Sequence, residues 1–457
     1  MDSSLLTTAR HCSQVCRQWR SIFLSSSLIW GRLIDVNGLK WTTDKWRKEI
    51  FARTGEAVLW VFGVADQDVW DFLSPFLQQN WRIVQILAIL NVDKPSKTSL
   101  ALQQKRWAFM KEPAPQLRRI EIQESSSISG LPTASFFADD APLLEDFSIQ
   151  WRHKFPTNTS WLSNLSSVTF SSSFTMDEVL MALPRMPRLI YLSVSMDRDT
   201  PPQKEPKVVL PNLRMLYTEG DRQSICILLQ CITPSPDCCL AMRRFLESRP
   251  AEDNGENPQF ENAVKSYIMP YFALHPPSAL TFSIGGGVLV LQDYISWDPR
   301  NPWVRCFCIV LDIPDPLPSS ILIKELCRSP WVPYITKFDL DAHGHPEYPD
   351  GLNNVAVISA LDALSSSATT LDTNIDTLRE LLERPLSYTS TLFPNLTTLN
   401  LDSELRYPPV PVEGEPPHHE FLKLRKAIGR PVSVLDLGFS RTSQLIWTTS
   451  KSTLAYW

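Results

Sequence analysis

The most regular feature of this sequence is a short pattern of apolar and polar positions that recurs along the chain. Each copy reads apolar-x-x-apolar-x-apolar and often follows a proline. The clearest copies are Leu117/Ile120/Ile122, Leu144/Phe147/Ile149, Leu165/Val168/Phe170, Leu189/Leu192/Val194 and Leu396/Leu399/Leu401, with a weaker copy at Leu213/Leu216. Because residues two apart point to the same face of a strand, each copy predicts one short β-strand with one buried face.

The spacing of the copies indicates a stacked array. From Leu117 to Leu213 the intervals are 27, 21, 24 and 24 residues, within the range of about 20–29 residues that is typical of leucine-rich repeats. One such unit cannot bury its own apolar face, so neighbouring units must stack. The alternative is an ordinary α/β domain whose strands happen to share one pattern.

Further copies flank this regular set. Early strands are expected within 58–64 and 81–89, and later copies of the frame are Ala279/Phe282/Ile284, Ile335/Phe338/Leu340 and Val432/Leu435/Leu437. The later spacing is irregular, so we expect insertions near 239–265 and 296–331. Between strands, residues 176–186 have apolar residues at helical spacing, with Thr175 as the expected N-cap and Glu178 completing a capping box.

The chain opens with a second pattern. Leu5, Ala9, Cys12, Cys16, Trp19 and Phe23 are separated by steps of four and three, which predicts one amphipathic helix. The serines at 25–27 can end this helix and cap the next one. Leu28, Trp30 and Leu33 then form a second small apolar group.

The string VCRQWRSIFLSSSLIW resembles the second half of an F-box. In that family a V-C-x-x-W-R helix is followed, after a short polar break, by L-W. The matching residues are Val15, Cys16, Trp19, Arg20, Leu28 and Trp30. The resemblance covers roughly residues 4–34. The Leu-Pro turn and first helix of the family motif are not among them, so adaptor binding stays open.

Together the two patterns resemble the F-box/leucine-rich-repeat proteins, in the divergent style found in mushroom-forming fungi. The resemblance implies an α/β fold, with a short N-terminal helical F-box remnant (1–36) and a degenerate leucine-rich-repeat solenoid (37–457). Its parallel strands would line the concave face, with helices outside. It also implies a non-catalytic receptor of a cullin-RING (SCF-type) ubiquitin ligase, which joins a Skp-type adaptor to an unknown client protein. The alternative is an interaction scaffold that no longer binds the adaptor.

Composition narrows the partners further. The net charge of -5 and the pI of about 5.9 argue against a nucleic-acid-binding protein, which usually has a basic face. The longest apolar runs, such as residues 83–90, are too short to cross a bilayer. The N-terminus lacks the apolar core of a secretory signal. The odd count of nine cysteines does not favour a disulfide framework. We therefore expect an intracellular protein, cytoplasmic or nuclear, without a nucleic-acid or membrane partner.

Candidate chemistry is sparse. His343 and His345, near Asp341 and Glu347, could hold a metal, but a solvated loop is the favoured interpretation. His418 and His419 lie in a proline-rich stretch that is expected to be extended. The glycines at 285–287 lack a phosphate-binding motif, which favours a tight turn. Cys226, Cys231, Cys238 and Cys239 are expected to be buried free thiols. We predict no enzyme activity, no metal and no cofactor.

Six early tryptophans form the remaining notable group: Trp41, Trp46, Trp60, Trp70, Trp81 and Trp107. They could form an aromatic platform for a ligand. Because large rings bury much area, the favoured interpretation is that they fill the junction between the N-terminal helices and the first repeats.

Overall fold

The computed structural model describes residues 5–92, 100–124, 136–149, 155–196, 206–244, 258–285, 288–293, 307–312, 321–343, 355–401 and 415–437. Two compact units make up the chain. Unit 1 spans 1–213 together with 230–235 and the final residue, and unit 2 spans 214–229 and 236–456. The division that the sequence suggested at residue 36 stays a prediction.

Unit 1 alternates short helices with parallel strands. Its N-terminal elements are α1 (Leu5–Cys12), α2 (Arg17–Ser25), α3 (Ser27–Gly31), β1 (Ile34–Asp35), α4 (Val36–Lys40) and α5 (Asp44–Thr54). The repeats follow as β2 (Leu59–Ala65), α6 (Gln67–Asn80), η1 (Trp81–Ile83), β3 (Val84–Asn91), α7 (Leu100–Arg106), η3 (Ala108–Lys111), β4 (Arg119–Glu124), η4 (Phe136–Asp139), β5 (Asp146–Ile149), η5 (Ser160–Asn164), β6 (Ser167–Phe170), α8 (Met176–Ala182), η6 (Leu183–Arg185) and β7 (Tyr191–Met196). A separate parallel pair joins β8 (Val208–Leu210) to β10 (Ile232–Pro234).

The strands of unit 1 stack in chain order. β1 to β7 are consecutive parallel neighbours. The first strand positions of the frame meet in register, in the row Ile120, Phe147, Val168 and Leu192, and the second positions form the row Ile122, Ile149, Phe170 and Val194. All eight side chains are at most 1% exposed. The strand stacking predicted from the sequence is therefore confirmed.

The same type of turn precedes each strand that carries a clear copy of the frame. The first residue of the frame donates its N–H to the carbonyl three residues earlier in every clear copy, as Leu144 does to Ala141. An asparagine directly before that residue joins neighbouring repeats in three copies. Asn164 Nδ2 donates to Pro142 O at 3.0 Å, Asn212 Nδ2 to Pro187 O at 2.8 Å, and Asn395 Nδ2 to Ser366 O at 2.8 Å. Each acceptor lies two residues before the corresponding frame position of the preceding repeat.

The helix expected at 176–186 is present. α8 covers Met176–Ala182 and η6 continues it to Arg185. Thr175 Oγ1 accepts from Glu178 N at 3.3 Å, and Thr175 N donates to Glu178 Oε2 at 3.0 Å. This is the predicted capping box, which satisfies two N–H groups that the helix leaves without an internal partner.

The single opening helix expected over Leu5–Phe23 is wrong. The chain forms α1 and α2 with a break at 13–16. Cys16 adopts an extended conformation as the N-cap of α2, and its Sγ accepts from Trp19 N at 3.4 Å. Side-chain capping competes with helix continuation. The apolar stripe also lacks a surface to bury against, because no residue of α2 is buried. The serine break is confirmed, since α2 ends at Ser25 and α3 begins at Ser27.

Five of the six early tryptophans divide into two groups, and the sixth, Trp60, is partly exposed on β2. Trp70, Trp81 and Trp107 are at most 3% exposed and contact other rings of the core. Their burial is as expected, and these ring contacts lie within the first repeats. Trp41 and Trp46 are 83% and 44% exposed, so for these two residues the interpretation as junction filling is wrong.

Unit 2 continues the strand–helix alternation. Its elements are β9 (Met215–Gly220), α9 (Arg222–Cys231), β11 (Cys239–Arg244), α10 (Pro258–Leu274), β12 (Ala279–Gly285), β13 (Val288–Asp293), β14 (Cys308–Asp312), α11 (Ile321–Cys327), η7 (Val332–Tyr334), β15 (Lys337–His343), α12 (Val355–Ser365), β16 (Thr370–Thr373), α13 (Ile375–Leu382), α14 (Leu386–Thr389), β17 (Thr398–Leu401), α15 (Pro417–Ala427) and β18 (Val434–Asp436). The sheet order is β9-β11-β14-β13-β12-β15-β16-β17-β18.

Most neighbours in the sheet of unit 2 are parallel. The exception is β13, which runs antiparallel to both β12 and β14. Residues 239–244, inside the first expected insertion, form β11 and pair in parallel with β9. Gly285 pairs with Val288 in the antiparallel pair of β12 and β13, while the other two glycines of the expected turn, at 286 and 287, lie outside the described residues. Leu280, Phe338, Leu371 and Leu399 form an in-register buried row.

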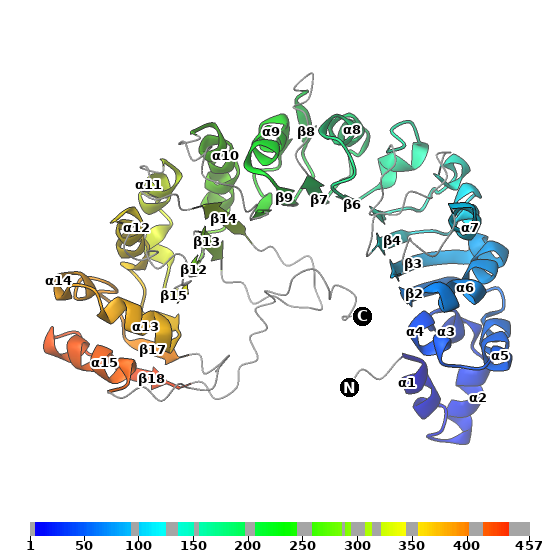
Figure 1. Ribbon diagram of the computed structural model, residues 1–457, viewed down its shortest axis with the longest axis horizontal. Helices are drawn as coiled ribbons and strands as arrows, with labels where there is room; N and C mark the ends of the chain where they lie inside the picture. The colour runs from blue at the N-terminus through cyan, green and yellow to red at the C-terminus, as the bar shows by residue number, and fades with distance from the viewer. Residues whose placement is uncertain are drawn as a thin grey trace. The chain divides into compact units, whose positions relative to one another are not determined.

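Each unit is therefore a mixed α/β structure with a largely parallel sheet, compatible with a leucine-rich-repeat fold. Within each unit the helices lie along one face of the sheet (Figure 1). The opposite face, called the open face below, presents the alternate strand residues. Among the described residues, no helix is both long enough and apolar enough to span a membrane.

Gly63 provides a test of how closely α4 packs on β2. Its φ is +130°, and an added Cβ would lie 2.8 Å from Val36 Cγ2. We expect Gly63→Ala to lower the free energy of unfolding by about 2–4 kcal/mol, because backbone strain and overpacking add. The measurement is thermal or denaturant unfolding. Gly55→Ala is the matched control, because its φ is +52° but its Cβ would meet Ser27 Cβ at 3.7 Å, and its expected cost is about 1 kcal/mol. Equal effects of the two changes would contradict the packing argument.

Candidate interaction surfaces

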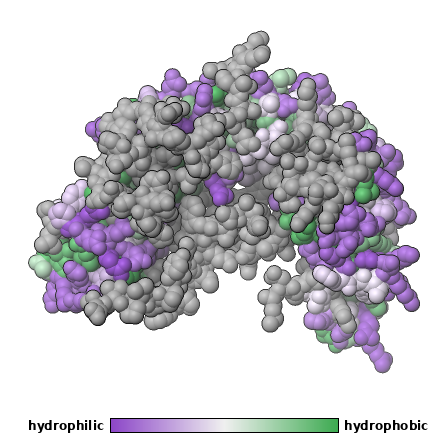
Figure 2. Space-filling model, in the orientation of Figure 1, coloured by the Kyte–Doolittle hydropathy of each residue, from purple (hydrophilic) through white to green (hydrophobic). Residues whose placement is uncertain are grey.

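The first candidate site is an apolar surface on the N-terminal helices. Val15, Trp19, Ile22 and Leu28 are 68%, 47%, 52% and 55% exposed. We call these four residues the N-terminal surface. Figure 2 shows hydrophobic residues at the surface among hydrophilic ones in the region of these helices. Contiguous exposed apolar residues of this kind, rimmed by polar ones, are typical of protein–protein contact sites.

The other residues of the F-box-like string hold the helices in place, Trp30 from a buried position and Cys16 and Arg20 from exposed ones. Trp30 is 6% exposed, its Nε1 donates to Phe23 O at 2.7 Å, and the Arg53 guanidinium lies 5.4 Å from its ring centroid. Trp30 thereby ties α2 to α5. Cys16 caps α2, and Arg20 Nε donates to Ser13 O at 3.2 Å. The resemblance to an F-box implies that all six residues contact an adaptor. Of the apolar ones, Val15, Trp19 and Leu28 are exposed and Trp30 is buried.

The segment that carries the N-terminal surface has charges of one sign. Residues 5–33 contain no aspartate or glutamate and include Arg10, Arg17, Arg20 and Arg32. Arg17 and Arg20 lie exposed on the same helix as Trp19. A partner that buries the apolar residues is therefore expected to present acidic groups around its own apolar contact.

The second candidate site is the open face of unit 1. Its strand positions change character along the sheet. On β2 and β3 they are apolar: Trp60 pairs with Ile86, Phe62 with Ala88, and Val64 with Leu90. On β4 and β5 they are polar, with Arg119 opposite Asp146 and Glu121 opposite Ser148. The open face of unit 1 thus joins an apolar block to a charged one.

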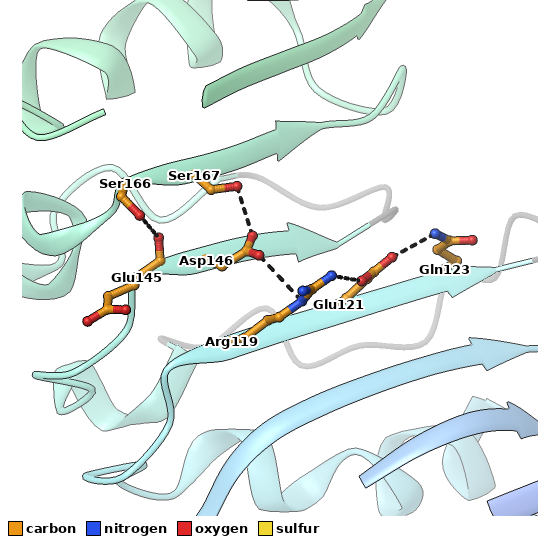
Figure 3. Close-up of polar contacts among 7 residues, drawn as sticks. All are labelled: Arg119, Glu121, Gln123, Glu145, Asp146, Ser166 and Ser167. Atoms are coloured by element: carbon orange, nitrogen blue, oxygen red, sulfur yellow. Dashed lines mark hydrogen bonds and ion pairs between the residues drawn. The ribbon is translucent and has the colours of Figure 1, made fainter. Parts of the chain in front are cut away.

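The charged block is a connected network (Figure 3). Arg119 donates to Glu121 Oε2 at 2.7 Å, and its Nε lies 3.4 Å from Asp146 Oδ2. Gln123 Nε2 donates to the other oxygen of Glu121 at 2.9 Å, and Ser167 Oγ donates to Asp146 Oδ1 at 3.0 Å. Burial, reinforced by the Glu121 charge, raises the pKa of Asp146, although Arg119 and Ser167 act in the opposite direction. One guanidinium therefore faces two carboxyl groups.

The open face of unit 2 has an acidic row. Thr281, Asp339, Asp372, Asn400 and Asp436 occupy matching positions on five parallel strands. Lys337 Nζ lies 2.7 Å from Asp372 Oδ2, and Asn400 Nδ2 donates to Asp372 Oδ1 at 2.6 Å. Burial, followed by the charges of Asp372 and Asp341, raises the pKa of Asp339 to about 7. Its carboxyl group accepts a hydrogen bond from Thr281 Oγ1 at 3.2 Å.

The structure also gives the positions of the histidines that the sequence analysis singled out. His343 ends β15, while His345 and Glu347 lie outside the described residues. His418 and His419 belong to α15, so the extended conformation expected for these two residues is wrong, and the proline-rich residues up to 414 lie outside the described ranges. The helix begins at Pro417, a position where proline costs no hydrogen bond. Within the described ranges, no group of three or more His, Cys, Asp or Glu is arranged to hold a metal.

Four cysteines are buried thiols as expected. Cys226, Cys231, Cys238 and Cys239 are each at most 5% exposed and form no disulfide. Burial, followed by the charge of Asp237, raises the pKa of Cys238 to about 12. A thiol with so high a pKa is protonated at neutral pH and is a poor nucleophile.

Comparisons with known proteins give limited information. No protein-family model matches this sequence, and no curated protein does. Among solved structures, the chain is similar to the leucine-rich repeat-containing protein LegL7 from Legionella pneumophila. The identity is 12%, the match covers 87% of this chain and 90% of that chain, and the TM-score is 0.22. Because that TM-score is low, the description of the fold rests on the strand pairing and burial given above.

Two tryptophans of the N-terminal helices should respond differently to removal. Trp30→Ala should lower the free energy of unfolding by about 3–5 kcal/mol, because it empties a buried site and removes the tie to Phe23 O. Trp19→Ser should cost less than about 1 kcal/mol, because nearly half of the side chain is already in water. Denaturant unfolding measures both values. A large loss for Trp19→Ser would show that this ring supports the fold.

Asp339 should make stability depend on pH. Its folded pKa of about 7 lies above the ordinary value of about 3.9, so the folded state holds a proton that the unfolded state releases. The resulting stability is present below pH 4 and is lost as the pH rises to about 7. Asp339→Asn, measured by unfolding at pH 5 and pH 8, should gain about 1–2 kcal/mol relative to the native protein at the higher pH.

The control for this experiment is Asp436→Asn, which changes an exposed carboxylate of the same row on the edge strand β18. It should leave the pH dependence of unfolding as it is in the native protein. If Asp339→Asn gave the same pH dependence as the native protein, the raised pKa of Asp339 in the folded state would be refuted.

Proposed function

We propose that this protein is a non-catalytic receptor subunit that joins a client protein to a Skp-type adaptor of a cullin-RING ubiquitin ligase. The observation that carries the proposal is the exposed apolar surface on α2, α3 and the turn before α2. It is formed by Val15, Trp19 and Leu28 of the F-box-like string, together with Ile22. The adaptor would bury these side chains, and its acidic groups would face Arg17 and Arg20.

The client would bind elsewhere, on the open faces of the strands. Parallel stacking places side chains from neighbouring strands about 4.8 Å apart, which makes a continuous binding surface from residues distant in sequence. In unit 1, the row from Trp60 to Tyr191 runs across six strands. Such a surface suits recognition of a protein segment rather than a reaction on a small molecule.

A second function is favoured by a different observation. The resemblance covers only the second half of the F-box motif, and half a motif offers less area for the adaptor. In that case the chain is an interaction scaffold, in which α1–α3 close the first strand of unit 1. Gly31 supports this reading, because an added Cβ there would lie 2.5 Å from Val58 O. The helices are thus seated closely on the chain leading into β2.

Binding to a purified Skp-type adaptor separates the two functions. We expect the full chain to bind the adaptor in a titration by calorimetry or fluorescence anisotropy. Trp19→Ser should weaken binding by about tenfold or more, because an exposed aromatic anchor is removed. Met181→Ser is the matched control, since Met181 is 63% exposed on α8 and lies outside the N-terminal surface. Its affinity should equal that of the native chain.

The opposite results are equally informative. If the native chain is folded but does not bind the adaptor, only the scaffold function remains. Binding that Trp19→Ser and Met181→Ser weaken equally would show that the N-terminal surface is not the adaptor site.

A further inference from the structure

The open face of β2 and β3 departs from the rest of the sheet. Trp60, Phe62 and Val64 on β2 alternate with buried residues and are themselves only partly exposed, as are Ile86 and Leu90 on β3. Ala88 lies between them. The described helices of unit 1 lie along the other face of the sheet, so these side chains form an apolar block on the open face. At its edge, the Arg32 guanidinium lies 4.8 Å from the ring centroid of Trp60, and Trp60 Nε1 donates to Gln85 Oε1 at 2.8 Å.

Apolar open-face positions are not needed for stacking. The two buried rows on the other face already fix the strand register, and polar residues occupy the same open positions on β4 to β7. A strand with one solvated face ordinarily alternates apolar with polar residues. The change from polar to apolar at β2 and β3 therefore indicates a contact that removes these side chains from water.

The neighbouring charged block has an excess of negative charge. Glu121 and Asp146 both face Arg119, which forms ion pairs with each. The two carboxylate charges also act on β7. Burial raises the pKa of the Tyr191 hydroxyl, and the charges of Asp146 and Glu121 raise it further. An added cation beside Glu121 and Asp146 would complete the pairing of two carboxylates with two positive groups.

We propose that this face of unit 1 binds a peptide segment of the client that combines an aliphatic or aromatic side chain with a lysine or arginine. The apolar side chain lies against Trp60 and Ile86, and the cation lies beside Glu121 and Asp146. Two strand spacings separate the blocks, so the two client groups are about 10 Å apart. The proposal rests on the proposed function, because it names the chemistry of the client.

The test starts from a random 12-residue peptide library displayed on phage and selected against the full chain. Selected peptides are then synthesised and their affinity is measured by fluorescence anisotropy. We expect them to share an apolar residue and a lysine or arginine. Ile86→Thr, and separately the double change Glu121→Gln with Asp146→Asn, should each weaken binding by roughly tenfold. The amide side chains keep the hydrogen bonds to Arg119 and Ser167, and unfolding midpoints establish that the variants are folded.

Two control variants match these changes. Ile190→Thr removes an apolar side chain that is 41% exposed before β7, and Asp177→Asn removes an exposed carboxylate of α8. Both should bind the selected peptides like the native chain. Added salt should weaken binding to the native chain and have much less effect on the amide double variant, because only the former pairs with the peptide cation.

Three results would overturn the inference. They are a library without enriched peptides, enriched peptides that are acidic, and enriched peptides that bind the open-face variants as well as the native chain. The adaptor titration with the same variants separates this failure from failure of the proposed function. Ile86→Thr and the amide variant leave the N-terminal surface intact, so their adaptor binding should be native.

Discussion

The structure of each unit depends on apolar side chains that meet in register across parallel strands. In unit 1, Phe147 pairs in register with Ile120 on the preceding strand and with Val168 on the following strand, and each of these side chains is at most 1% exposed. In a single isolated strand these side chains would be exposed to water, so their burial requires the neighbouring repeat. Everything else follows from this constraint, including the turn before each strand, the helices that cover one face and the open face that remains for partners.

The buried rows could be predicted from the sequence because their cause is local and periodic. A frame of three apolar residues is enough to specify a strand, and a near-constant interval is enough to specify its neighbours. The asparagine contacts were missed because their partners lie one repeat away. Asn164 and Asn212 look like ordinary turn residues until the preceding carbonyl is placed beside them. The antiparallel hairpin of β12 and β13 was missed because β13 has no copy of the frame.

The candidate surfaces were less predictable for a related reason. Periodicity states which residues share a face of a helix, but not whether that face has something to pack against. Trp19 and Trp30 belong to one motif, yet only Trp30 is buried, because Arg53 and the carbonyl of Phe23 surround it. Likewise, the apolar block at Trp60 and Ile86 appears only when β2 and β3 are aligned. The bulge between Leu59 and Trp60 sets that alignment, and no sequence signal marked it.

The N-terminal surface also has an energetic consequence. α2 is nine residues long and none of its residues is buried, whereas isolated helices shorter than about 12–15 residues are marginal in water. Its order therefore depends on few polar contacts, which include the Cys16 cap, the Arg20 bond to Ser13, the bond from Trp30 to Phe23 and the bond from Arg53 to Leu24 O. Under the proposed function, a partner that covers Trp19 and Ile22 would supply burial that the described residues do not. Binding and helix stability would then be coupled, and part of the binding energy would be spent on ordering α2. A substitution that weakens the cap at Cys16 would accordingly weaken binding of that partner, even where the partner does not contact Cys16.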